Sequence, residues 1–131
     1  MNPFKKDKKQ LSIFVTAGYP ELNSLKPQLL QLQELGVDFA EVGIPFSDPM
    51  ADGPVIQETS TVALQNGMKL ELLLQQLEEA RSEINIPLVL MGYLNPVLQF
   101  GLDSFLSRCQ KLAIASLIPV SYTHLTLPTT A

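Results

Sequence analysis

Hydrophobic and polar positions recur along this chain with two different periods. Four short segments rich in β-branched or aromatic residues have the length and composition of strands: Ser12–Thr16, Val37–Val42, Pro87–Tyr93 and Ile114–Val120. In the stretches between them, apolar residues lie three or four positions apart, which is typical of amphipathic helices. The pattern therefore predicts strands that alternate with helices.

Each helical stretch carries one apolar stripe. The stripes are Leu25, Leu29 and Leu32; Leu73, Leu77, Ala80 and Ile84; and Phe105, Cys109 and Leu112. Ser24 is placed to cap the first helix and Gly36 to end it, and a turn at Asn95-Pro96 is expected before the third.

Alternating strands and helices indicate an α/β protein with right-handed crossovers and a parallel sheet. The alternation does not separate a doubly wound open sheet from part of a (β/α)₈ barrel, because both folds produce it. No G-x-G-x-x-G follows the first strand and no Walker-type loop occurs. A nucleotide-binding sheet is therefore the weaker interpretation.

Composition narrows the functional classes. The 131 residues, 46% of them hydrophobic, suit one soluble domain, and no apolar run reaches the roughly 20 residues that span a bilayer. We expect a cytoplasmic protein without membrane or metal partners. The net charge of −4 and a lysine cluster confined to the first ten residues give no basis for nucleic-acid binding. Cys109, the single cysteine, fits a buried apolar position.

The connection from the second to the third strand holds the candidate chemistry. It begins with an irregular Pro/Gly/Asp-rich stretch, 43–54, after a strand's C-terminal end, where parallel α/β folds place active sites. Apolar neighbours would partly desolvate Glu41 and poise it for proton transfer, and Asp52 could fold back over the same pocket. The alternative is structural: Asp48 and Asp52 as turn residues, and Glu41 paired with a lysine.

Three motifs resemble the tryptophan synthase α subunit family. The longest reads E-x-G-x-P-F-S-D-P-x-A-D-G-P-x-I-Q and spans 41–57. F-V-T-A-G-Y-P at 14–20 and M-G-Y-L-N-P at 91–96 are similar to the family's first strand and loop and to its third strand and turn. The resemblance extends from about Leu11 to Ile118.

The resemblance implies a TIM barrel that cleaves indole-3-glycerol phosphate to indole and glyceraldehyde 3-phosphate by a retro-aldol reaction. Glu41 matches the family's principal acid/base, and Asp52 matches the carboxylate that interacts with the indole N–H. The positions that match the family's apolar indole pocket are Phe14, Ile56, Met91 and Tyr93.

The resemblance also implies a partner and the location of the cofactor. Pro45 and Asp48 match loop positions that face the family's β subunit in an α₂β₂ assembly. The α subunit carries no cofactor; pyridoxal phosphate belongs to the β partner, which receives indole through a tunnel.

The chain departs from the family in its length and its C-terminal residues. A (β/α)₈ barrel needs about 250 residues, so residues 1–118 are predicted to form the N-terminal half of the barrel, without its phosphate-binding loops. Residues 119–131 do not resemble the family and look like translated adapter or vector sequence, so His124 is given no role. We expect weak activity at most; a non-catalytic module that docks on the β subunit and a small doubly wound domain are the alternatives.

Overall fold

The structure is a computed structural model that describes residues 9–47 and 53–120. The predictions for Asp48, Asp52 and His124 lie outside these ranges. The described elements are β1 (Ser12–Thr16), α1 (Leu25–Glu34), β2 (Phe39–Gly43), α2 (Pro54–Gln65), α3 (Leu70–Ala80), the 3₁₀ turn η1 (Arg81–Glu83), β3 (Leu88–Tyr93), α4 (Leu94–Phe100), α5 (Leu102–Lys111) and β4 (Ser116–Val120).

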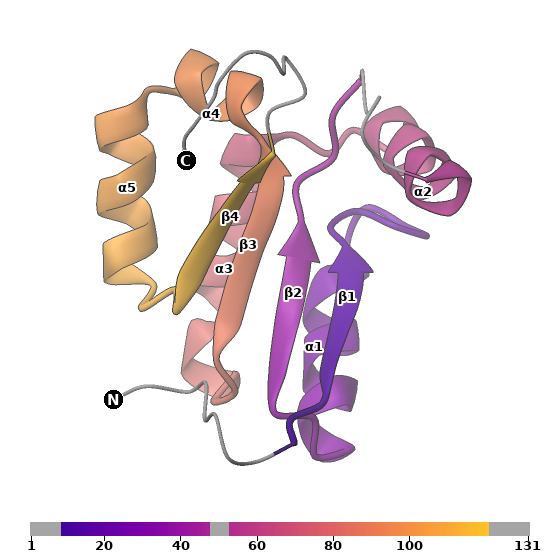
Figure 1. The fold of residues 1–131 in the computed structure, drawn as a ribbon, viewed down its shortest axis with the longest axis vertical. Coiled ribbons are helices and arrows are strands. Elements are labelled where there is room, and N and C mark those ends of the chain that lie inside the picture. Colours follow the sequence, from indigo (N-terminus) through magenta and orange to yellow (C-terminus); the bar gives the residue numbers. More distant parts are fainter. Residues whose placement is uncertain (1–8, 48–52, 121–131) are drawn as a thin grey trace.

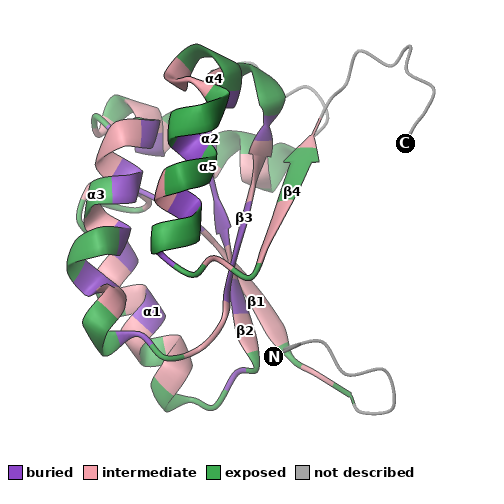
Figure 2. Cartoon of the chain, turned by 90° about the vertical axis from the view of Figure 1, so that its left-hand side faces the viewer, coloured by how far each residue is buried: buried purple, intermediate pink, exposed green. Residues whose placement is uncertain are grey.

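The four strands form one parallel sheet in the order β1-β2-β3-β4 (Figure 1). Helices α1, α3 and α5 pack against one face of this sheet, and the described part of the chain places no helix over the middle of the other face (Figure 2). A doubly wound sheet has helices on both faces and a reversal of strand order. The doubly wound alternative is therefore wrong, and the prediction of a sheet of the barrel type is confirmed.

Strand register divides the sheet residues between the two faces. Phe14 pairs with Glu41, Glu41 with Val89, and Val89 with Ser116, so these four side chains form one row across the sheet. Because side chains alternate along a strand, the residues two positions away share their face. We call this surface, which α1, α3 and α5 do not cover, the open face.

The core lies between the opposite face and the helices. Its largest fully buried side chains are Leu25, Leu29, Val42, Leu73, Leu74, Leu77, Ile84, Leu88, Val89 and Leu90. Most of them come from the predicted helix stripes and from strand positions on the covered face, since burying those stripes is what holds the helices on the sheet. There are two exceptions: Leu74 lies on α3 beside the predicted stripe, and Val89 is buried within the open-face row. Cys109 is buried in this core, as predicted.

Several predicted boundaries need correction. β2 begins at Phe39 rather than Val37, because the Val37 N–H donates back to the Leu32 carbonyl (3.3 Å) where α1 ends. β4 begins at Ser116 rather than Ile114 for the same reason, since the Ile114 N–H donates to the Cys109 carbonyl (3.1 Å). A helix end thus extends two residues into each predicted strand.

The turn expected at Asn95-Pro96 is wrong, because both residues lie in the first turn of α4. Proline is tolerated there, since the first N–H groups of a helix have no partner within the helix. Gly36 has φ +85°, the left-handed conformation that ends α1 as predicted. Ser24 occupies the N-cap position, but its hydroxyl accepts from the Glu21 N–H (3.0 Å) instead of capping the helix.

Within the described ranges, no helix has both the length and the apolar character needed to cross a bilayer. Across those ranges, no three His, Cys, Asp or Glu side chains gather into a group that could hold a metal ion.

Candidate active site

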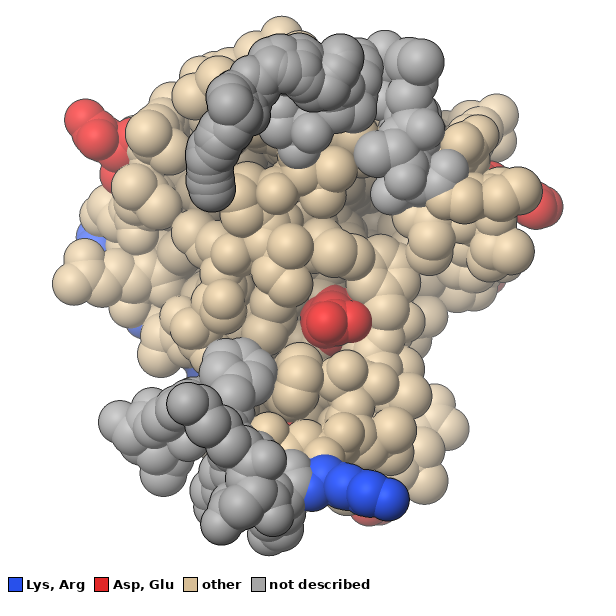
Figure 3. Space-filling model, in the orientation of Figure 1, with Lys and Arg blue, Asp and Glu red and all other residues tan. Residues whose placement is uncertain are grey.

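Glu41 lies on the open face at the centre of β2. Phe14 on β1 and Val89 on β3 stand beside it in register, so its carbon chain is half-buried between apolar neighbours. Figure 3 views the open face directly and shows acidic surface near its middle, surrounded by uncharged residues. A carboxylate flanked by apolar side chains and facing what would be a barrel interior is suited to proton transfer.

A hollow lies at the C-terminal ends of the strands, two residues beyond Glu41. The predicted substrate-binding residues all line it: Phe14, Ile56, Met91 and Tyr93. They come from β1, α2 and β3, so the fold brings together positions that are up to 79 residues apart in sequence. The structure thus gathers the four side chains around one space, while their role in binding stays a prediction.

Glycine at position 43 gives the Phe14 ring its place. A Cβ atom built on Gly43 would overlap the tip of that ring, with the ring Cε1 only 2.9 Å away. The backbone of Gly43 therefore forms the floor on which Phe14 lies. The same close approach explains why glycine, two residues after Glu41, fits this point of β2.

Thr16 and Thr59 join β1 to α2 at the edge of the hollow. Their hydroxyl oxygens are 2.9 Å apart, and the Thr59 hydroxyl is 3.0 Å from the Ile56 carbonyl oxygen. This contact holds the first turns of α2, which carry Ile56, against the end of β1. Sequence reasoning missed Thr16 and Ser60, which also line the hollow. Thr16 lies two residues after Phe14 and Ser60 four after Ile56, spacings that place each on the face of a predicted site residue.

Tyr93 is buried at the end of β3, and its ring contacts Phe46 with centroids 5.0 Å apart and planes inclined at 33°. Pro45, between β2 and Phe46, is buried as well. Its predicted contact with a partner subunit stays a prediction. The position of Asp52 relative to Glu41 lies outside the described residues.

Side-chain amides hold the β1–α1 loop, 17–24, at the rim of the site. The Asn66 amide donates to the carbonyls of Gly18 (2.9 Å) and Pro20 (2.7 Å), and the Gln28 amide donates to the Tyr19 carbonyl (3.0 Å). Because these donors come from α1 and from the end of α2, they tie the loop to the helices around it.

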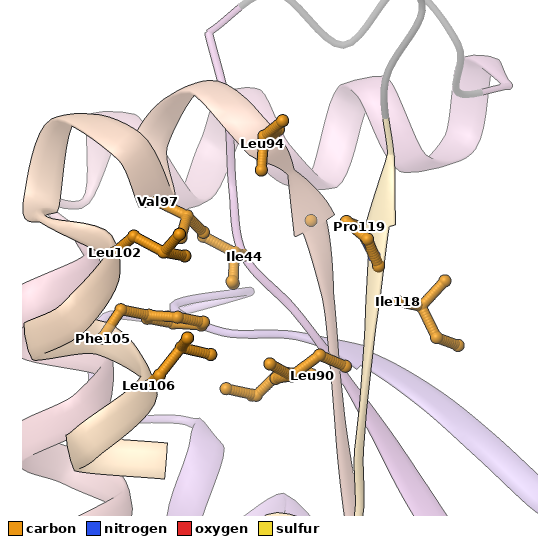
Figure 4. Close-up of a pocket in the computed structure, with 11 residues that line it drawn as sticks. Ile44, Leu90, Leu94, Val97, Leu102, Phe105, Leu106, Ile118 and Pro119 are labelled. Atoms are coloured by element: carbon orange, nitrogen blue, oxygen red, sulfur yellow. The ribbon is translucent and has the colours of Figure 1, made fainter. Parts of the chain in front are cut away.

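A larger apolar hollow, of about 140 Å³, lies on the covered side of the sheet between α4, α5 and β4 (Figure 4). Its walls include Leu90, Val97, Leu102 and Phe105, and it contains almost no polar surface. Figure 4 shows Ile118 pointing away from these residues, toward the open face. Since the hollow is separated from Glu41 by the sheet and offers no group for acid–base chemistry, it is not the candidate active site.

The resolved charge interactions lie on the helices, away from the open face. Arg108 on α5 pairs with Glu78 (2.6 Å) and Glu71 (3.3 Å) on α3, and its hydrogen bond lowers the pKa of Glu71. Burial raises the pKa of the Cys109 thiol to about 11, against a smaller opposing effect of Arg108. Arg108, its two partners and Cys109 all belong to the helical layer. None of them lines the hollow near Glu41.

Comparison with known proteins gives one consistent family. The sequence profile of the family described as Tryptophan synthase alpha chain matches residues 2–123. The chain is 52% identical over 114 residues to the tryptophan synthase alpha chain of Flavobacterium psychrophilum, covering 87% of this chain and 45% of that protein. It is 56% identical over 108 residues to that of Parabacteroides distasonis, covering 82% and 42%.

Solved structures agree with the sequence comparison. The crystal structure of tryptophan synthase subunit alpha from Legionella pneumophila superposes with a TM-score of 0.83 at 39% identity, covering 88% of this chain and 44% of that one. The chain therefore spans less than half the length of these relatives, and its sheet corresponds to half of their barrel.

Proposed function

The chain belongs to the tryptophan synthase α chain family, and from that premise we propose that its residues supply the acid–base half of an active site for indole-3-glycerol phosphate cleavage. The observation that carries this proposal is the position of Glu41 on the open face, beside the hollow lined by Phe14, Ile56, Met91 and Tyr93. A proton-transfer group next to flat apolar walls suits a substrate that joins an indole ring to a glycerol chain.

The proposed reaction is a retro-aldol cleavage. A proton is added at C3 of the indole ring, and the glycerol hydroxyl next to the breaking bond loses its proton. The electron pair of the carbon–carbon bond returns to the ring as the aldehyde carbonyl forms, which releases indole and glyceraldehyde 3-phosphate. Glu41 handles the protons at the hydroxyl and at C3. Asp52 accepts a hydrogen bond from the ring N–H and stabilises the positive charge of the protonated ring.

The hollow that the described residues form is too small for the proposed substrate. The hollow holds about 20 Å³ of free space, room for one or two water molecules rather than for a bicyclic ring. The remaining wall and the phosphate-binding loops belong to the second half of the barrel in the proposed enzyme. We therefore propose that the 131 residues by themselves cleave the substrate weakly at most.

The proposed physiological partner is a tryptophan synthase β subunit in an α₂β₂ assembly in the cytoplasm. Indole would pass to that subunit, where pyridoxal phosphate is bound, while this chain uses no cofactor. Pro45 and Asp48 are the proposed contact positions. Support comes from the family membership and from the location of Pro45 at the C-terminal end of β2, the end of the sheet that carries the site.

The test restores the missing half. Residues 1–118 are joined to the C-terminal half of the Flavobacterium psychrophilum relative, and indole release from indole-3-glycerol phosphate is measured. Glu41→Gln is expected to lower kcat by roughly 10²- to 10⁴-fold, because the substitution removes general acid–base catalysis but keeps the side chain's size. Glu34→Gln, on the exposed end of α1, is the matched control and is expected to leave kcat unchanged.

Two outcomes would count against the proposal. Equal rates for the chimera and its Glu41→Gln variant would show that this carboxylate carries no chemistry. A folded chimera that binds a β subunit but cleaves nothing would favour the alternative of a non-catalytic docking module.

A further inference from the structure

Thr16 and Ser60 place two aliphatic hydroxyl groups in the hollow near Glu41. Thr16, at the C-terminal end of β1, is 6% exposed, and Ser60, in the second turn of α2, is 4% exposed. Both residues line the hollow. Burying a polar group costs free energy unless the group finds a hydrogen-bond partner. Buried hydroxyls that face a hollow therefore mark a position where a polar group of a ligand can be held.

The direction of the Thr16 hydroxyl follows from its neighbour on α2, which lies beside the end of β1 (Figure 1). The Thr59 hydroxyl donates its proton to the Ile56 carbonyl oxygen (3.0 Å), and the hydroxyl oxygens of Thr59 and Thr16 are 2.9 Å apart. A hydroxyl has only one proton to donate. Since the Thr59 proton is already used, Thr16 donates to Thr59, and a lone pair on the Thr16 oxygen is left to accept. Thr59 is therefore a positioning residue that makes Thr16 an acceptor for a group in the hollow.

Ser60 has the complementary capacity. Its hydroxyl makes no hydrogen bond to any of the described residues, so its proton is available to a group in the hollow. The free space of about 20 Å³ holds one small polar group, about the size of a water molecule. A group that donates to Thr16 and accepts from Ser60 has to be both a donor and an acceptor, which is the character of a hydroxyl.

We propose that Thr16 and Ser60 bind one hydroxyl of the substrate's glycerol chain, the hydroxyl on the carbon next to the phosphate-bearing carbon. This hydroxyl donates to the Thr16 oxygen and accepts the proton of Ser60. The inference rests on the proposed function, to which it adds two residues that determine specificity.

The position of Thr16 in the sheet indicates which hydroxyl it binds. Thr16 pairs with Gly43, two residues beyond the pairing of Phe14 with Glu41, so it lies on the same face as Glu41 and nearer to the strand ends. In a closed (β/α)₈ barrel the last strand lies beside the first, and the loops after the last two strands bind phosphate. A glycerol chain that begins at Glu41 on β2 and ends at that phosphate site passes the end of β1. The hydroxyl that Glu41 does not handle is then the one beside Thr16.

Equilibrium binding of two ligands to the chimera tests the inference. Both ligands are indole-3-glycerol phosphate without the hydroxyl next to the breaking bond, so neither can be cleaved; the second ligand, the deoxy ligand, also lacks the hydroxyl assigned to Thr16 and Ser60. Calorimetry gives the Kd of each. Thr16→Val is expected to weaken binding of the hydroxylated ligand at least about fivefold, because its hydroxyl loses an acceptor, and to leave binding of the deoxy ligand unchanged. Thr16→Ser keeps the acceptor and should retain most of the affinity.

Variants on α2 give further readouts. Ser60→Ala removes the donor, so it should also weaken binding of the hydroxylated ligand alone. Thr59→Val should reduce the preference for the hydroxylated ligand without touching it, because Thr16 is no longer held as an acceptor. Thr61→Val, on the exposed face of α2, is the matched control and should change neither Kd. Circular dichroism shows whether each variant folds; if Thr16→Val does not, Ser60→Ala and the comparison of the two ligands on the unsubstituted chimera decide.

Three results would overturn the inference. The first is an equal Kd of the two ligands for the unsubstituted chimera, which would show that the hydroxyl finds no partner in the hollow. The second is a loss with Thr16→Val that is the same for both ligands, which would make the role of Thr16 structural. The third is a loss with Thr61→Val as large as that with Thr16→Val. The proposed function is judged separately, by the effect of Glu41→Gln on kcat, because neither ligand here is cleaved.

Discussion

Gly43 on β2 and Gly92 on β3 both lie in crowded positions. At Gly43 the neighbouring side chain can move away from an added methyl group, whereas at Gly92 it cannot. A Cβ atom at Gly43 would meet the tip of the Phe14 ring, whereas a Cβ atom at Gly92 would lie 2.8 Å from the Cβ of Ile44. The Phe14 ring is half-buried on the open face and can rotate away. The Ile44 Cβ is fixed to the backbone of a residue that is only 7% exposed.

The structure sets the expected magnitudes. For Gly43→Ala, turning Phe14 from its rotamer costs about 0.5–1.5 kcal/mol, and the smaller entropy of the unfolded chain returns about 0.4–1 kcal/mol. The net loss should be below about 1 kcal/mol. For Gly92→Ala, overpacking against a fixed atom costs about 1–3 kcal/mol before the same offset. Gly92→Ala should therefore be the more damaging change, by about 1 kcal/mol.

Urea unfolding followed by circular dichroism measures both free energies of unfolding. Phe14→Leu provides the internal control, because the shorter side chain removes the ring tip that the new methyl group meets. In that background the cost of Gly43→Ala should disappear, while the cost of Gly92→Ala should stay the same. A loss for Gly43→Ala that equals or exceeds that of Gly92→Ala, or that persists with Phe14→Leu, would refute the reasoning.

Two further predictions concern polar groups. Thr59→Val should lower the free energy of unfolding by about 1–3 kcal/mol, because the buried Thr16 hydroxyl loses its partner. Thr61→Val, at an exposed helix position, is the control and should change the free energy of unfolding by no more than about 0.5 kcal/mol. Equal losses for the two variants in urea titrations would contradict this. The Cys109 thiol has a pKa of about 11 in the folded protein, against an ordinary value of 9.0. Its contribution to the free energy of unfolding is therefore fully present below pH 9 and falls by about 2–3 kcal/mol as the pH rises through 11. The difference between the unfolding profiles of the wild type and Cys109→Ala should show this slope, and a flat difference would disprove it.

Periodicity alone located the strands and the principal helix stripes. Leu25, Leu29, Leu73 and Leu77 were predicted on buried faces and lie in the core, since a helix of this length holds its place by burying one stripe. The errors concern the residues at which helices and strands begin and end. Ile114 belongs to a helix end rather than to β4, because the backbone bonds that terminate a helix depend on geometry more than on residue type.

Sequence reasoning likewise predicted one part of the candidate site and missed another. The resemblance to the tryptophan synthase α family identified Phe14, Ile56, Met91 and Tyr93, which line the hollow, but nothing indicated the contact between Thr16 and Thr59. That contact joins residues 43 positions apart. Side-chain pairs at such separations are set by how α2 sits against β1, and nothing in the local sequence encodes it.

By itself, the sequence determined the alternation of strands and helices, the family, and the residue types available for proton transfer, because these depend on local patterns and on the order of residues. Tertiary structure decided that the helices cover one face of a sheet ordered β1 to β4, and that Phe14 lies over Gly43 beside Glu41. These features depend on strand register and on packing between distant segments. The sheet that results carries helices α1, α3 and α5 on one face, and among the described residues its edge strands β1 and β4 each pair with a single strand.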